Sequence, residues 1–117
     1  MSDPVLHIAT LSSWQEAQRA GSYAPEGLAA DGFIHCSKAG QVLRAAEAYY
    51  AGRTGLVLLV IDPGRLGSEV RWEPGTDQPG ELFPHVYGPL DLEAVVAVHP
   101  FEPGPDGRFS LPASLTR

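Results

Sequence analysis

The stretch Asp31–Ser37, with the sequence DGFIHCS, places a histidine where a short strand meets a helix. The opening Asp-Gly pair signals a turn, and the four residues after it are typical of a strand. Because strand side chains alternate, His35 shares one face with Phe33 and Ser37. Ser37 is predicted to cap the following helix, whose N-terminus favours anions. Two interpretations stay open: a ligand-facing His35 beside an anion, or a partly buried structural histidine.

Two helices are predicted in the N-terminal half of the chain. A strand at residues 5–9 precedes the first helix, which begins with a capping box at Ser13 and Glu16 and ends near residue 20. The second helix is predicted over residues 38–51, where apolar residues recur at helical spacing. Residues 23–30 contain Pro and Gly and are predicted to form a loop.

The rest of the chain is dominated by predicted strands. Residues 56–61 are apolar on both faces and predict a central strand that is covered on both sides. Helices come first and strands follow, which predicts an α+β fold with mostly antiparallel β-sheets and two helices in the N-terminal half. The further strands are predicted at residues 69–73, 81–87, 92–101 and 109–111.

Length and composition limit the class of protein. The 117 residues predict a single domain, 1–117, in which residues 103–117 form a loosely held C-terminal segment. A net charge of −6 without a Lys/Arg cluster argues against binding to duplex nucleic acid, but not against a small anionic ligand. The single Cys and the lack of a secretory signal or membrane span predict a cytoplasmic protein without a membrane partner. A protein partner is left open.

A second unusual stretch covers residues 83–89, with the sequence FPHVYGP. In an extended backbone Phe83, His85 and Tyr87 share one face. An aromatic ring, an imidazole and a phenol in a row are typical of the wall of a small-molecule site. The alternative is an aromatic core strip whose His and Tyr bind backbone atoms.

Arg71 and Glu73 share the polar face of the predicted strand at residues 69–73. They form either a solvated face or part of a site, in which Arg71 binds a phosphate or carboxylate and Glu73 binds a ribose or stabilises a cation. His7 on the first strand has the same two interpretations.

The sequence contains the elements of a zinc site without the usual spacing. His35, Cys36, Glu81 and His85 are suitable ligands, but no His-x-x-x-His, His-Glu-x-x-His or Cys-x-x-Cys motif is present. No metal is therefore expected. A nucleophilic role for Cys36 is not expected either, because its face of the strand is directed to the core.

Three motifs resemble those of a small bacterial family catalogued as domain of unknown function 952. They are DGFIHCS at residues 31–37, RWE at residues 71–73 and FPHVYGPL at residues 83–90. The family is grouped with the ADP-ribosyltransferase-like fold, in which small β-sheets surround a cleft that holds NAD in the active members. The resemblance therefore implies this fold and NAD as a substrate.

The resemblance also implies roles for the residues that would line the cleft. His7 would bind the NAD ribose, and Ser37 or Tyr87 would support the nicotinamide side. The glutamate that stabilises the oxocarbenium-like transition state would be Glu73 or Glu81, although neither lies in a Glu-x-Glu or Gln-x-Glu pattern. The predicted catalytic residues are His35, Glu73 and His85, and the predicted ligand-binding residues are His7, Ser37, Arg71 and Tyr87.

Three functional hypotheses follow. The first is an NAD-dependent ADP-ribosyltransferase or NAD glycohydrolase with a His-lined cleft. The second is a non-catalytic module that binds a nucleotide or another anionic metabolite. The third is a structural or interaction protein whose motifs serve only the fold.

Overall fold

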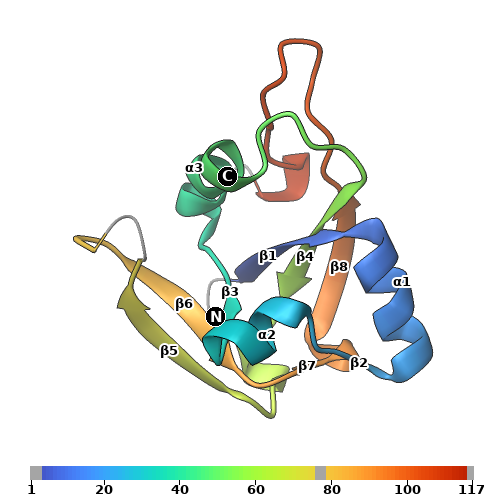
Figure 1. Cartoon of the computed structure of the whole chain (residues 1–117), viewed down its shortest axis with the longest axis vertical. Coiled ribbons are helices and arrows are strands. Elements are labelled where there is room, and N and C mark those ends of the chain that lie inside the picture. The colour runs from blue at the N-terminus through green and yellow to red at the C-terminus, as the bar shows by residue number, and fades with distance from the viewer. Residues whose placement is uncertain (1–3, 76–78, 116–117) are drawn as a thin grey trace.

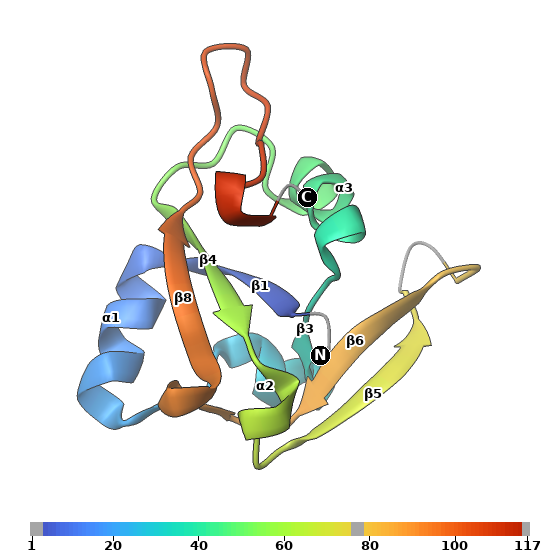
Figure 2. The same ribbon diagram turned by 180° about the vertical axis from the view of Figure 1, so that it is seen from behind.

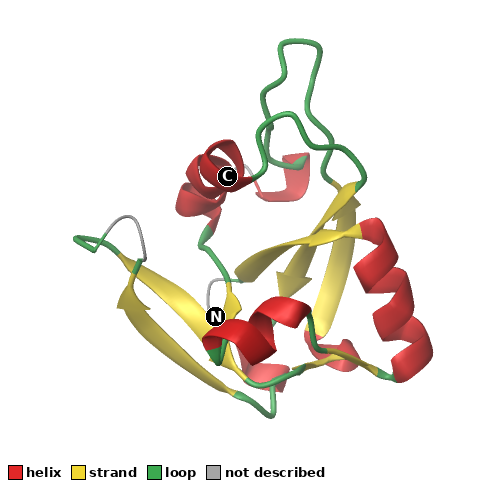
Figure 3. Ribbon diagram, viewed as in Figure 1, coloured by secondary structure: helices red, strands yellow, loops and turns green. Residues whose placement is uncertain are grey.

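The computed structural model describes residues 4–75 and 79–115. Within these ranges the chain forms three α-helices and eight strands, and every strand pairing is antiparallel (Figures 1 and 3). The predicted α+β class with mostly antiparallel sheets is therefore confirmed. In chain order the elements are β1 (Val5–Thr10), α1 (Leu11–Ala20), β2 (Ser22–Tyr23), α2 (Glu26–Asp31), β3 (Ile34–His35), α3 (Ala39–Tyr49), β4 (Leu56–Ile61), β5 (Glu69–Pro74), β6 (Leu82–Tyr87), β7 (Leu90–Asp91) and β8 (Val95–Pro100).

Strand β4 is the centre of the sheet β1-β4-β8, as its sequence predicts (Figure 2). All six of its side chains are buried. Leu59 belongs to a core cluster with Trp14 of α1, whereas Leu58 packs on the opposite face with Val42 of α3 and with Phe101. A run that is apolar on both faces is stable only when both are covered, and here helices lie on both sides.

Helix α1 begins at Leu11, so the predicted capping box is wrong. Thr10 is the N-cap, and its Oγ1 accepts a hydrogen bond from the backbone N–H of Ser13 at 3.1 Å. Thr10 performs this role because it is still extended and carries a hydroxyl group. Glu16 forms an ion pair with Arg19 instead.

The predicted loop at residues 23–30 is also wrong, because it contains part of β2 and most of a third helix, α2. Pro25 precedes α2 in extended conformation, and Gly32 ends it with φ 82°. Its two ends therefore carry the usual Pro and Gly signals. Its six residues are too few to show a helical repeat of apolar side chains.

A second sheet, ordered β3-β6-β5, carries the two motifs around His35 and His85. His85 lies directly opposite His35 on one side and Arg71 on the other, so the three side chains share a face. Ile34 and Val86 form the next pair and are buried in the core on the other face. The predicted alternation is confirmed, although β3 is shorter than predicted.

Lys38, not Ser37, is the N-cap of α3. Ser37 remains extended because its backbone forms a two-way bridge with Leu6 of β1, with both N–H···O distances 2.8 Å. The backbone N–H of Lys38 donates to Oε1 of Gln41 at 3.0 Å. The bridge ties the second sheet to the first immediately before the helix begins.

The C-terminal strand predictions are correct only in part. The predicted strand at residues 92–101 is divided, since Leu92–Ala94 form a 3₁₀ turn before β8. Residues 109–111 form no strand, and Phe109 instead stacks on Phe101 with ring centroids 4.9 Å apart. Residues 116–117 of the predicted segment 103–117 lie outside the described residues. No helix in the described part of the chain has the length and hydrophobicity needed to cross a membrane.

Candidate functional site

A cleft of about 810 Å³ follows the edge of β1 and is bordered by α2, α3 and the strand β3. Small-molecule sites commonly enclose about 300–1,000 Å³. Strand β6 contributes Phe83 and His85 to its lining. Aromatic rings suited to stacking on a planar ligand also line it, namely Tyr23, Phe33, Tyr49, Tyr50 and Phe83. The cleft is therefore large enough for a nucleotide.

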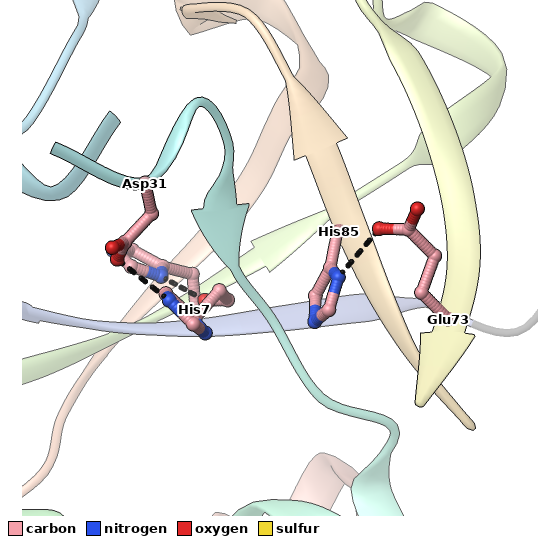
Figure 4. A network of polar contacts seen from close by, with 5 residues as sticks. His7, Asp31, Glu73 and His85 are labelled. Atoms are coloured by element: carbon pink, nitrogen blue, oxygen red, sulfur yellow. Dashed lines mark hydrogen bonds and ion pairs between the residues drawn. The ribbon is translucent and has the colours of Figure 1, made fainter. Parts of the chain in front are cut away.

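His85 is held in one orientation by Glu73 on the neighbouring strand β5. The Nδ1 atom of His85 lies 2.8 Å from Oε1 of Glu73 (Figure 4). A carboxylate only accepts hydrogen bonds, so Nδ1 donates and the neutral ring keeps Nε2 as an acceptor. The ring is 4% exposed and lines the cleft, and its Nε2 has no hydrogen-bond partner among the described residues. This is the geometry of an oriented general base.

Tyr87 fixes the same carboxylate from a second direction. Its hydroxyl donates to Oε1 of Glu73 at 2.6 Å. The hydrogen bonds from Tyr87 and His85 hold the pKa of Glu73 below its ordinary value, and the carboxylate in turn raises the pKa of Tyr87. Glu73 therefore stays ionised and holds the tautomer of His85. Neither Glu73 nor Tyr87 lines the cleft itself.

His35 places a second imidazole beside the first. The ring centroids of His35 and His85 are 5.5 Å apart. Nε2 of His35 lies 2.9 Å from Oδ2 of Asp31, at the end of α2. Phe33 contacts both rings, stacking on His85 at 4.1 Å and tilting against His35 at 4.7 Å. Two imidazoles, each with its own carboxylate, thus stand side by side at one cleft.

His7 has no free ring nitrogen. Its Nδ1 donates to the backbone carbonyl of His35 at 2.7 Å, and the hydroxyl of Tyr23 donates to its Nε2 at 2.8 Å. Burial lowers the pKa of His7 from 6.5 to about 4 and raises the pKa of Tyr23. His7 is therefore neutral near pH 7 and fixes the backbone that carries His35. A ligand would have to displace one of its two partners to bind the ring nitrogens.

The other predicted site residues are divided between the cleft and the sheet. Ser37 is buried and lines the cleft, whereas Arg71 does not. The guanidinium of Arg71 lies 4.4 Å from the ring centroid of Tyr87 and forms an ion pair with Glu69. Glu81, the second glutamate considered above, accepts hydrogen bonds from Arg44 and Gln41 and lies outside the lining.

Sequence patterns did not identify Asp31 or Tyr23 as part of the site. Asp31 lies four residues before His35, and this spacing is the one signal that would have linked them. Tyr23 has no such local signal. It is positioned because β2 pairs with β7, where Tyr23 lies opposite Leu90.

Within residues 4–75 and 79–115, no group of three or more His, Cys, Asp or Glu side chains is arranged to hold a metal ion. Cys36 is buried among the core side chains, and this burial raises the pKa of its thiol. A thiol held in the protonated form is a poor nucleophile.

A comparison with protein families supports the resemblance that the three motifs carry. The profile of a family described as "Protein of unknown function (DUF952)" matches residues 8–98. The chain belongs to this family. The matched range contains β3, β5 and β6, which carry the three motifs. No functionally curated protein matches the chain.

Solved structures of protein CC0527 from Caulobacter crescentus have the same fold. The crystal structure is 30% identical, with a TM-score of 0.86 over 97% of this chain and 99% of that chain. The solution NMR structure is 29% identical, with a TM-score of 0.81 over 97% of each chain. The name of this neighbour states no activity or fold group, so the similarity does not support the predicted assignment to the ADP-ribosyltransferase-like fold group.

Proposed function

We propose that the cleft binds a nucleotide and cleaves its N-glycosidic bond, with NAD as substrate, in the manner of an ADP-ribosyltransferase-like protein. The acceptor is water or the hydroxyl of a second molecule. The observation that carries the proposal is the pairing of Glu73 with His85, which leaves Nε2 of the imidazole as a proton acceptor at the cleft.

The reaction requires one base. The bond between C1′ of the ribose and nicotinamide breaks, and its electron pair stays on the nicotinamide nitrogen, which becomes neutral. The oxygen of water or of the acceptor hydroxyl bonds to C1′ and gives its proton to Nε2 of His85. Glu73, 2.8 Å from Nδ1, stabilises the resulting imidazolium. A well-placed general base contributes about 10²–10⁴-fold to a rate.

The cleft also supplies groups that could position such a substrate. Phe33 and Phe83 offer aromatic surface for the planar rings, and the backbone around Ser37 passes through the lining immediately before α3. The volume of about 810 Å³ leaves room for a nucleotide beside His85.

The test is release of nicotinamide from NAD, followed by chromatography. The wild-type protein should release it, and His85→Ala should reduce the rate by about 10²–10⁴-fold. His99→Ala is the matched control, because His99 lies on β8 outside the cleft and should leave the rate unchanged. The absence of both nicotinamide release and calorimetric NAD binding would contradict the proposal.

A binding module without turnover is the second candidate. Glu73 lies outside the cleft lining and already accepts hydrogen bonds from His85 and Tyr87. It is therefore poorly placed to stabilise a positive ribosyl group directly. This candidate predicts that ADP-ribose raises the melting temperature, that His35→Ala abolishes the shift, and that NAD is bound but recovered intact.

A further inference from the structure

The reaction described above leaves His35 without a role. Nicotinamide departs from NAD as a neutral molecule, so the leaving group needs no proton. One imidazole, His85, is enough to take the proton of the attacking water. Yet the cleft holds a second imidazole, 5.5 Å from the first and hydrogen-bonded to Asp31 at 2.9 Å.

A purine leaving group makes a different demand. When the bond between C1′ and a neutral purine breaks, the purine departs as an anion unless it is protonated. A general acid on the leaving-group side lowers this barrier, commonly by about 10²–10⁴-fold. An imidazole ring can donate such a proton from one nitrogen while a carboxylate accepts a hydrogen bond from the other.

His35 meets these requirements in the structure. Oδ2 of Asp31 accepts a hydrogen bond from Nε2 of His35, so Nδ1 is the nitrogen that remains for a substrate. The side chain is 50% exposed, and a proton lost to a substrate can therefore be replaced from solvent. Phe33 lies against both imidazoles, stacked on His85 and tilted against His35.

The charge of the cleft also suits a neutral substrate, which needs no cations to bind it. Among the described lining residues, Arg53 is the one Lys or Arg, and its guanidinium lies 5.2 Å from the ring centroid of Tyr50. Glu26 and Asp31 bring carboxylates to the same lining. Carboxylates accept hydrogen bonds from the ribose hydroxyls that a nucleoside presents.

We infer that the cleft hydrolyses neutral purine nucleosides, with His35 as the general acid for the departing base and His85 as the general base for water. This inference rests on the proposed function, because it uses the same cleft and the same base. Water bonds to C1′ through its oxygen and gives one proton to Nε2 of His85. The bond to the purine breaks, its electron pair goes to the purine, and His35 supplies the proton. The products are ribose and the free purine.

Asp31 acts as a positioning residue in this scheme. It holds the ring of His35 by Nε2, which leaves Nδ1 to serve the substrate. Asp31→Asn removes the carboxylate that favours the protonated ring of His35, and it should therefore shift the basic limb of the pH–rate profile for a purine nucleoside to lower pH, which a purely structural role would not do.

The test compares substrates whose leaving groups differ in their need for a proton. Inosine requires one, whereas NAD and 4-nitrophenyl riboside do not. Wild-type protein should release hypoxanthine from inosine. His35→Ala should reduce inosine hydrolysis by about 10²-fold or more, and the other two rates far less, so that the rate ratio changes at least about tenfold. His35 is half exposed, and a melting curve verifies that the variant is folded.

The outcomes separate this inference from the proposed function. Cleavage of NAD without cleavage of inosine overturns the inference and leaves the proposed function standing. Cleavage of inosine without NAD supports the inference and removes NAD as the substrate. Equal losses on all three substrates in His35→Ala overturn the acid role. If the wild-type protein is folded, as its melting curve verifies, and cleaves none of the three substrates, both the inference and the proposed function are overturned.

Discussion

The two three-stranded sheets differ in which of their faces are buried in the core. In β1-β4-β8 the central strand buries every side chain, and apolar clusters cover both sides. In β3-β6-β5 one face contributes Ile34 and Val86 to the core, while the other carries His35 and His85. The first sheet therefore serves as the scaffold, and the second presents polar groups at the cleft. His7 connects the two sheets, because it belongs to β1 and donates a hydrogen bond to the backbone carbonyl of His35 in β3.

The largest expected effect concerns the polar face of the second sheet. Glu73→Gln removes the charge that fixes the tautomer of His85, and it should reduce NAD cleavage by about 10²–10⁴-fold. The measurement is the initial rate of nicotinamide release. Glu69→Gln is the matched control on the same strand, because Glu69 pairs with Arg71 and does not contact His85. Equal losses in both variants would contradict the role of Glu73.

Substitutions at the core of the scaffold sheet β1-β4-β8 should lower the stability of the protein. Leu59→Ala removes a fully buried side chain at the centre of β4 and should lower the free energy of unfolding by about 2–5 kcal/mol. Urea denaturation measures this change. Val98→Ala is the control, because Val98 lies directly opposite Leu59 on β8 but is 38% exposed. An equal loss in the free energy of unfolding for Val98→Ala and Leu59→Ala would contradict the assignment of Leu59, and not Val98, to the core.

His7, which connects the two sheets, should make the stability of the protein depend on pH. The pKa of His7 falls from 6.5 to about 4 in the folded protein because of burial, so the unfolded chain binds a proton at higher pH than the folded chain does. Stability should therefore decrease as the pH falls from about 6.5 to about 4. At about 1.4 kcal/mol per pH unit, the loss from this group is about 3 kcal/mol.

Urea midpoints between pH 7 and pH 4 measure this loss. Asp and Glu side chains also titrate near the lower limit, so the wild type is compared with His7→Asn. The variant should be less stable at pH 7 and should lack the additional decrease between pH 6.5 and pH 4. Parallel pH curves for the two proteins would mean that His7 is not the buried neutral group described here.

The smallest expected effect lies at the outer edge of the second sheet. Arg71→Ala removes an exposed ion pair with Glu69 and a contact with the Tyr87 ring. Exposed contacts of this kind contribute little, and the free energy of unfolding should change by less than about 1 kcal/mol. A thermal melt measures it. A larger loss would indicate that the polar face is part of the structural core.

Local sequence patterns predicted the parts of the fold that depend on neighbouring residues. The run at residues 56–61 indicated a doubly covered strand, and alternation placed His35 and His85 on the faces opposite to Ile34 and Val86. Such patterns depend only on the geometry of an extended chain. They are therefore visible without a structure.

Other features depend on contacts between distant residues and could not be predicted this way. The hydrogen bonds of His7 with Tyr23 and with the backbone of His35 join segments that are 16 and 28 residues apart. Ser37 lost its predicted role as a cap because its backbone pairs with Leu6. Helix α2 was missed for a different reason, since six residues are too short for a periodic pattern.

The central claim is that His85 presents an unprotonated Nε2 to a ligand in the cleft. The most direct measurement is a ¹⁵N NMR spectrum of the histidine rings, recorded with and without ADP-ribose. We predict that His85 is protonated at Nδ1, that its Nε2 signal moves when ADP-ribose is added, and that His99 does not change. A proton on Nε2 in the free protein, or a His85 signal that stays fixed while ADP-ribose binds, would contradict the account.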